Sequence, residues 1–158
     1  MKPLASLKGH KGEVLCVETS PLVPDLAGSG SEVQNSLTQP LPDQGFDHDL
    51  SLSHLIQDGS ARLWDLKSHK SIRRIGRVFE NEAVTALLFH RKDPHILFAA
   101  AGESIFGFDL RRPEVLLHEA KFGLGGIAED EISQMSMSEG GNSLAVVDDS
   151  GMLQVSNP

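Results

Sequence analysis

The chain carries a histidine, a serine and an aspartate whose types could support nucleophilic chemistry, at His10, Ser29 and Asp58. In many hydrolases these three types form a triad, in which the histidine activates the serine and the carboxylate orients the histidine. A hydrolase serine stands on a sharp strand-to-helix turn, whereas Ser29 lies inside the strand-like stretch 26–32. Because the sequence shows no other convergent acid, base and nucleophile, we do not expect an enzyme.

The elements that must position these side chains are short strands. The apolar runs 14–17, 84–89 and 96–99 are strand-sized and rich in β-branched or aromatic residues, and turn-forming residues separate them. No stretch keeps a 3.6-residue period for three turns, so helices are not expected. The sequence therefore predicts an all-β fold. The expected strands are 4–8, 13–19, 25–31, 60–65, 71–78, 84–90, 96–101, 104–109, 114–119, 131–137, 143–148 and 152–156.

A repeat joins these strands into similar units. Gly9-His10 opens the first unit and Trp64-Asp65 closes it; Phe108 follows Trp64 by 44 residues, and Val155 follows Phe108 by 47 residues. A period of roughly 40–45 residues that opens with Gly-His and closes with Trp-Asp is typical of propeller blades. On these residues the sequence resembles the WD40-repeat family, over nearly the whole chain apart from 33–57. The resemblance implies four-stranded blades of a β-propeller.

The length of the chain allows about three such blades. His10 and Trp64 lie 54 residues apart, and the excess is the polar stretch 33–57, which we expect to be a disordered loop inserted in the first blade. The predicted organisation is a partial propeller over 1–158. It comprises an N-terminal strand and blade one (1–78), blade two (79–120) and a partial blade three (121–158). Since a ring needs roughly 4–8 blades, we expect an incomplete propeller: a fragment, a truncated isoform, an incomplete gene model, or an open array that assembles with another chain.

The resemblance gives the polar residues of the first unit a structural role. WD repeats often carry a tetrad of His, Ser or Thr, Asp and Trp, and the matching residues here are His10, Ser29, Asp58 and Trp64. In such a tetrad the four polar groups satisfy one another, in a setting where an unpaired group would be costly. We therefore prefer the structural tetrad to the hydrolytic triad.

The later units depart from this tetrad. In blade two, Phe108 replaces the tryptophan and Gly102 stands at the turn position. In blade three, Asp149 keeps the turn position, while Val155 and Ala145 take the tryptophan and serine positions. We expect these blades to depend on packing more than on a polar network.

A second family pattern concerns partners. After the closing tryptophan the chain carries Asp65 and Lys67. This pattern resembles the box by which WD-repeat substrate receptors dock on the damage-binding adaptor of cullin-4 ubiquitin ligases, with Lys in place of the preferred Arg. Blade two keeps Asp109 and Arg111 but lacks the tryptophan and the turn aspartate. An arginine can pair with such an aspartate and hold the corner between the third and fourth strands. Chance is the competing explanation, because any WD repeat followed by Lys or Arg matches.

Composition narrows the classes of partner. The 14 Lys and Arg residues against 22 Asp and Glu give a net charge of −8, so nucleic acid is not an expected direct partner. No apolar run approaches the roughly 20 residues of a membrane span, no apolar signal core follows the first residues, and one cysteine excludes an internal disulfide. We expect protein partners, no membrane partner, and an intracellular location in the cytoplasm or the nucleus.

No cofactor and no metal are expected. Asp47, His48, Asp49 and His54 have ligand chemistry, but they lie in the insert without supporting groups, and a solvated run is the better interpretation. The sequence-based hypothesis is a non-enzymatic WD40 scaffold for protein–protein interaction, with a substrate-receptor role in a cullin-4 ubiquitin ligase. The alternatives are a general assembly scaffold of a chromatin or trafficking complex, and a non-functional truncated isoform.

Overall fold

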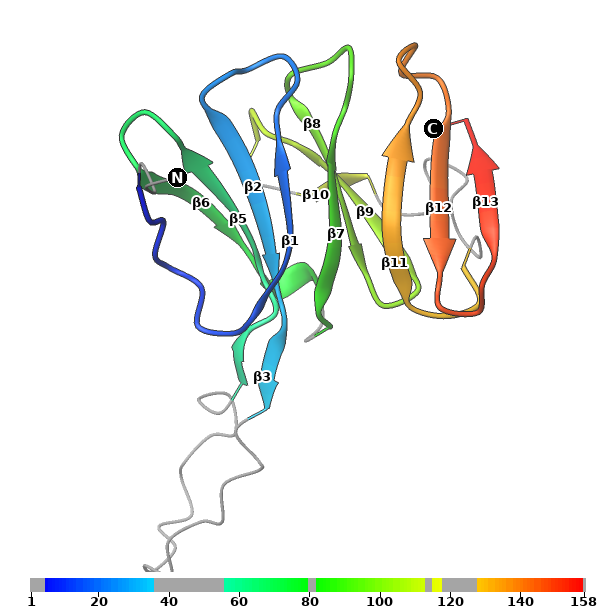
Figure 1. The fold of residues 1–158 in the computed structure, drawn as a ribbon, viewed down its shortest axis with the longest axis horizontal. Helices are drawn as coiled ribbons and strands as arrows, with labels where there is room; N and C mark the ends of the chain where they lie inside the picture. Colours follow the sequence, from blue (N-terminus) through cyan, green and yellow to red (C-terminus); the bar gives the residue numbers. More distant parts are fainter. Residues whose placement is uncertain (1–4, 36–55, 80–81, 113–114, 118–127, 158) are drawn as a thin grey trace, which may run out of the picture.

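The computed structural model describes residues 5–35, 56–79, 82–112, 115–117 and 128–157. These residues form three antiparallel sheets, which stand side by side in chain order, and one two-stranded hairpin (Figure 1). Within the described ranges there is no α-helix, and the only helical turn is the 3-10 segment η3 (Arg77–Phe79). The all-β prediction is confirmed for this part of the chain. This part of the chain contains no helix that is long and apolar enough to cross a membrane.

Within each sheet, neighbouring strands follow one another along the chain. Blade one contains β1 (Val14–Thr19), β2 (Leu26–Ser31), β5 (Ala61–Asp65) and β6 (Lys70–Ile75). Blade two contains β7 (Val84–Phe89), β8 (Ile96–Ala101), β9 (Ser104–Asp109) and β10 (Val115–Leu117). Blade three contains β11 (Ile132–Met137), β12 (Leu144–Asp148) and β13 (Leu153–Ser156). The expected strands therefore exist, except the one at 4–8.

Apolar side chains between the sheets hold the blades together. Because successive residues of a strand point to opposite faces, the side chains of β8 contribute to two hydrophobic cores. Leu97 and Ala99 pack toward blade one, in a cluster that includes Leu63 and Phe79. Phe98 packs on the other side, in a cluster that includes Ile132 and Leu144 of blade three. Blade two is buried on both faces, which explains why β8 is apolar without interruption.

The backbones of blades one and two approach closely at Gly30. A Cβ atom at this position would lie 2.5 Å from the carbonyl oxygen of Val84 and 2.6 Å from the sulfur of Cys16. Only glycine fits between the two sheets here, because any larger residue would push β2 away from β7. Burial raises the pKa of the Cys16 thiol to about 11, so this cysteine is a packing residue rather than a reactive one.

Two expectations about the ends of the elements are wrong. Residues 5–8 form no strand, because a lone strand without a neighbour in a sheet has no ladder to join. The two ends of the predicted loop 33–57 are paired: β3 (Val33–Asn35) runs antiparallel to β4 (Ile56–Asp58). This hairpin projects beyond one end of blade one (Figure 1). Pairing satisfies the backbone groups where the chain leaves and re-enters the blade; residues 36–55 lie outside the described ranges.

Candidate functional site

The structure brings His10, Ser29, Asp58 and Trp64 together in one hydrogen-bonded chain. The indole Nε1–H of Trp64 donates to the Ser29 hydroxyl at 2.8 Å, and that hydroxyl lies 2.7 Å from Nε2 of His10. The other ring nitrogen, Nδ1, lies 2.9 Å from a carboxylate oxygen of Asp58. These distances fit a neutral imidazole that carries its proton on Nδ1, accepts from Ser29 and donates to Asp58. These hydrogen bonds connect β2, β5 and the segment before β1 to one another.

Asp58 is the hub of this network. It accepts hydrogen bonds from the Ser60 hydroxyl and from the Lys11 amide as well as from His10. Burial by itself would raise the pKa of Asp58, but these hydrogen bonds outweigh it and lower the pKa to about 2. The backbone of Asp58 has a φ of 97°, a strained conformation for a residue with a side chain. The surrounding hydrogen bonds offset that strain.

The order Ser29–His10–Asp58 is that of a hydrolytic triad, but Ser29 is buried and its hydroxyl is also held by the Trp64 indole. The Ser29 oxygen accepts from Trp64, which draws electron density away from the group that would attack a substrate. A hollow of about 280 Å³ adjoins it, and apolar side chains such as Leu7, Val14 and Val17 contribute to its lining. The chemistry that the network can perform is therefore positional: it fixes strands and leaves an apolar surface beside them.

Blade three repeats part of the network, on Asp148 rather than on Asp149. Asp148 is buried and accepts from the Ser150 hydroxyl at 2.6 Å and from the Glu129 amide at 3.1 Å, as Asp58 accepts from Ser60 and Lys11. The Ser150 hydrogen bond is the main cause that holds the pKa of Asp148 below its ordinary value. Asp149 lies in the turn, as expected, but it is exposed, and the hydrogen bonds of the network go to Asp148 at the end of β12. The spacing Asp-x-Ser, common to both turns, is the sequence signal that identifies Asp148.

The corner between β9 and β10 contains a rigid ion pair. The Arg111 guanidinium donates to both carboxylate oxygens of Asp109, at 2.8 Å from Nε and 2.6 Å from the terminal nitrogen. This hydrogen-bonded pair lowers the pKa of Asp109 to about 2. The Asp109 side chain is 8% exposed, whereas that of Arg111 is 59% exposed. The corner thus presents an exposed guanidinium whose position is fixed by the buried Asp109 carboxylate.

The corner between β5 and β6 is built differently. Asp65 accepts from the Lys67 amide at 2.8 Å and from the Ser68 hydroxyl, also at 2.8 Å. The hydrogen bond from the Ser68 side chain is the main cause that lowers the pKa of Asp65. The turn is therefore held by Ser68 and by backbone groups, and the exposed Lys67 adds only a weak attraction between charges. Sequence reasoning did not anticipate the role of Ser68.

Arg73 of β6 contacts the corner between β9 and β10. Its guanidinium donates to the Leu110 carbonyl at 3.2 Å and to the Arg112 carbonyl. These carbonyls belong to the β9–β10 corner, so the corner of blade two is fastened to the outermost strand of blade one. We use the name corner edge for the two corners together with the arginine that contacts the second of them: residues 65–68, Arg73 and 109–112.

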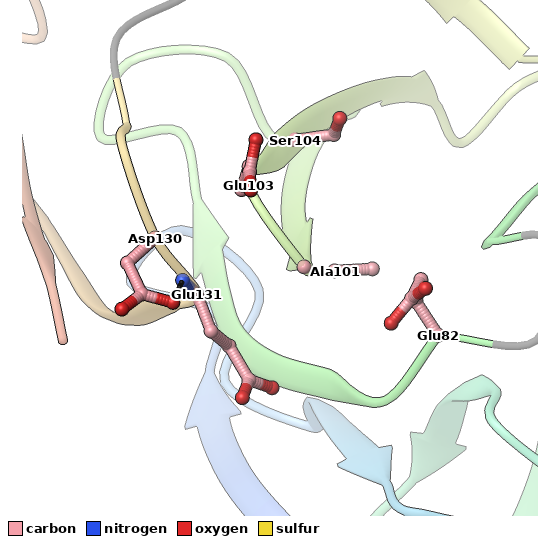
Figure 2. A pocket seen from close by; sticks show the side chains of 7 residues that line it. Glu82, Ala101, Glu103, Ser104, Asp130 and Glu131 are labelled. Atoms are coloured by element: carbon pink, nitrogen blue, oxygen red, sulfur yellow. Dashed lines mark hydrogen bonds between the residues drawn. The ribbon is translucent and has the colours of Figure 1, made fainter.

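An acidic hollow of about 410 Å³ lies where the β8–β9 turn meets the segment before β11. Figure 2 shows four carboxylate side chains around it, those of Glu82, Glu103, Asp130 and Glu131. They come from three separate turns, and for this reason the sequence did not reveal the cluster. Across the described ranges no group of three or more His, Cys, Asp or Glu is suited to hold a metal. The weak metal candidates at 47–49 and 54 lie outside those ranges.

Three consecutive antiparallel meanders packed face to face, the first of them stabilised by a His–Ser–Asp–Trp network, have the architecture of WD40-type propeller blades. The chain resembles WD-repeat proteins. It is similar to the WD repeat-containing protein 53 homolog of Dictyostelium discoideum, with 29% identity over 153 residues. The match covers 94% of this chain and 33% of that relative, so the chain spans about a third of the length of the curated relative it matches. No family model matches the sequence.

Proposed function

We propose that this chain is a non-enzymatic scaffold, or part of one, that binds protein partners inside the cell. Its resemblance to a WD-repeat protein supports this class. The tetrad supports it as well, because it uses the most reactive residue types of blade one to fix strands rather than to act on a substrate. The function then depends on the surfaces that the blades expose.

The partner that we propose for the corner edge is the damage-binding adaptor of cullin-4 ubiquitin ligases. The observation that carries this proposal is the Asp109–Arg111 pair, which holds an exposed guanidinium in one orientation. Little side-chain entropy is lost when a partner carboxylate meets a cation that is already oriented. Arg73 adds support, because it fastens the β9–β10 corner to strand β6 of blade one.

The test is capture of the adaptor by the tagged chain in human cells, with quantitative mass spectrometry of the bound proteins. The Arg111→Ala variant and the double variant of Asp65→Asn with Lys67→Ala should each reduce recovery of the adaptor and of cullin-4. Arg112→Ala is the matched control, because it removes a neighbouring exposed guanidinium and keeps both the Asp109–Arg111 pair and the backbone hydrogen bond from the residue 112 amide to the Asp109 carbonyl. Circular dichroism and thermal melting verify that each variant is folded.

Two outcomes contradict the adaptor proposal. Adaptor recovery that stays at the level of the unaltered chain in both Arg111→Ala and the double variant would remove the corner edge as the docking site. Absence of adaptor and cullin-4 peptides from the unaltered chain, with other proteins recovered reproducibly, would favour the alternative, a general assembly scaffold without a ligase link.

A further inference from the structure

The turn between β1 and β2, residues 20–25, exposes two large apolar side chains. Leu22 is 43% exposed and Val23 is 36% exposed. The other large apolar side chains that the described residues expose lie on strands of blades one and three rather than in turns. Neither Leu22 nor Val23 belongs to the hydrophobic clusters between the sheets, so the packing of the blades does not require an apolar residue at either position.

This turn has a fixed backbone, and blade two repeats it between β7 and β8. In blade one, the Val23 amide donates to the Ser20 hydroxyl at 3.1 Å. In blade two, the Asp93 amide donates to the His90 ring at 3.0 Å. In each turn the amide of the first residue also donates to the carbonyl of the first residue of the next strand. The two turns therefore share one hydrogen-bonded framework.

The side chains that the two turns present differ in chemistry. Both turns lie at the end of the blades opposite the β3–β4 hairpin (Figure 1). In the shared framework Leu22 takes the place of Lys92, and both Lys92 and its neighbour Arg91 are exposed although blade two packs on a blade at each face. A blade that covers the face of a sheet thus leaves this turn uncovered. The exposure of Leu22 and Val23 consequently does not depend on what adjoins the face of blade one.

The surroundings of the turn are basic. The Leu66 amide donates to the Asp25 carbonyl at 2.8 Å, which joins the turn to the β5–β6 corner. Burial raises the pKa of Glu18 and the charge of Arg91 lowers it, so Arg91 lies near the end of β1, where the turn begins. Across 20–25, 65–68, 90–95 and 109–112, the one exposed acidic side chain is that of Asp25, and the exposed basic ones are those of Lys67, Arg91, Lys92, Arg111 and Arg112.

The other carboxylates of these four segments are already engaged. Asp65 and Asp93 accept hydrogen bonds from backbone amides of their own turns, and Asp109 is paired with Arg111. They therefore do little to offset the exposed basic side chains. A partner that approaches this end of blades one and two meets an apolar tip with positive charge on the sides of both corners.

We propose that the turn 20–25 is the apolar anchor of an interface at this end of the blades, and that it enters an apolar pocket bordered by Asp or Glu side chains on a partner protein. Apolar residues at the centre and polar residues at the rim are the usual anatomy of a protein interface, and opposite charges guide the approach. The hydrogen-bonded backbone reduces the entropy that the turn loses on binding.

The apolar tip favours a protein over a nucleic acid as the partner. A phosphate backbone would meet the basic side chains, but it would leave Leu22 and Val23 without an apolar contact. The inference rests on the proposed scaffold function, because it assumes that the chain binds a protein at this end. It does not require that the partner be the cullin-4 adaptor.

The first experiment is photo-cross-linking in cells that express the tagged chain. The photoreactive amino acid p-benzoylphenylalanine replaces Leu22, and mass spectrometry identifies the cross-linked peptides. We expect peptides in which apolar residues are flanked by Asp or Glu. The same photoreactive residue in place of Glu103, in the turn at the opposite end of β8, is the control and should not cross-link to these peptides.

The second experiment measures recovery of the cross-linked protein by variants of the tagged chain. Leu22→Ser combined with Val23→Ser should reduce the recovery by about tenfold, because the apolar contact is lost. Arg91→Ser combined with Lys92→Ser should reduce it by about threefold to tenfold at low salt and by less at high salt, since salt screens the attraction between exposed charges.

A matched control changes two exposed residues of the corresponding turn of blade three. Glu139→Ser combined with Asn142→Ser should leave the recovery unchanged. The hydrogen bonds of the turn 20–25 use backbone groups and the Ser20 hydroxyl, so the variant with serine at positions 22 and 23 keeps them. Circular dichroism and thermal melting verify that each variant is folded.

Several results would overturn the proposal: no cross-link from position 22 above that from position 103, cross-linked peptides without acidic residues, cross-links to nucleic acid alone, or a partner that the turn variants still recover in full. Failure of the adaptor proposal gives a different result, because the cross-linked protein is then not the adaptor while its peptides are still acidic and apolar. Adaptor recovery that falls in Arg111→Ala but not in Leu22→Ser combined with Val23→Ser would keep the corner edge and remove the anchor.

Discussion

The indole nitrogen of Trp64 donates to the hydroxyl of Ser29 at 2.8 Å, although 35 positions separate the two residues in the sequence. Most of that separation is the stretch between β2 and β5, which the β3–β4 hairpin closes at its base. Because the hairpin returns the chain to the blade in register, Ala27 still pairs with Trp64 and Gly30 with Ala61. A long insertion is thus compatible with an intact polar network in blade one.

The first prediction concerns the stability that this network provides. Ser29→Ala should lower the free energy of unfolding by about 1–3 kcal/mol, because it leaves the Trp64 N–H and the His10 ring without their shared partner in a buried site. Urea denaturation measures the change. Ser136→Ala, at an exposed position of β11, is the control. Equal stability of both variants would show that the network contributes no stability.

The second prediction concerns how the stability of the fold depends on pH. The pKa of Asp58 is lowered from 3.8 to about 2 in the folded chain, so the unfolded chain takes up this proton first as the pH falls. The stabilisation from ionised Asp58 is complete above the unfolded pKa and is lost as the pH falls from 3.8 toward 2. Asp109 and Asp148, whose pKa values are also lowered, contribute in the same direction. Asp58→Asn should therefore be less stable at neutral pH and should lose less stability on acidification.

Urea denaturation at a series of pH values tests this prediction. Asp149→Asn is the matched control, because it removes the same charge from an exposed position in the equivalent turn of blade three. If Asp58→Asn and the unaltered chain lost stability equally between neutral and acid pH, the stabilising role of the ionised carboxylate would be refuted.

The third prediction concerns Arg73. Arg73→Met keeps an apolar stem but removes the hydrogen bonds to the Leu110 and Arg112 carbonyls. The corner 109–112 should then open more often, and its amides should exchange with deuterium about threefold to tenfold faster, as expected for roughly 1 kcal/mol of lost local stability. Lys70→Met, on the same strand, removes the same charge and should leave this exchange unchanged. Unaltered exchange in Arg73→Met would mean that Arg73 does not fasten the corner.

Strand positions follow from local sequence patterns, whereas the four members of the first network follow from the resemblance to WD repeats. Turn residues and the Trp64-Asp65 ending mark β5, the similar Phe108-Asp109 ending marks β9, and the long interval between His10 and Trp64 marks the insertion. The sequence did not predict Arg73, Ser68 or the acidic hollow, because each depends on contacts between segments that no short pattern contains. It also pointed to Asp149 for the network of blade three, whereas the hydrogen bonds go to Asp148, one residue earlier. In that turn the buried carboxylate is the one two residues before Ser150, which donates to it. The distance in sequence to the end of the third strand does not identify it.

The last prediction concerns the residues between β3 and β4. Asn35 pairs with Ile56, so the stretch 36–55 can be replaced by Asn-Gly, the sequence that favours a two-residue hairpin turn. Shortening the closed loop from twenty residues to two should raise the free energy of unfolding by about 1–2 kcal/mol, because less chain entropy is lost on folding. The β3–β4 pairing and the Trp64–Ser29 hydrogen bond should persist in the shortened chain, and urea denaturation together with NMR of the indole N–H tests both points. A Gly-Ser linker of the original length is the control and should leave stability unchanged. A loss of stability in either variant would mean that residues 36–55 contribute contacts that hold the blade.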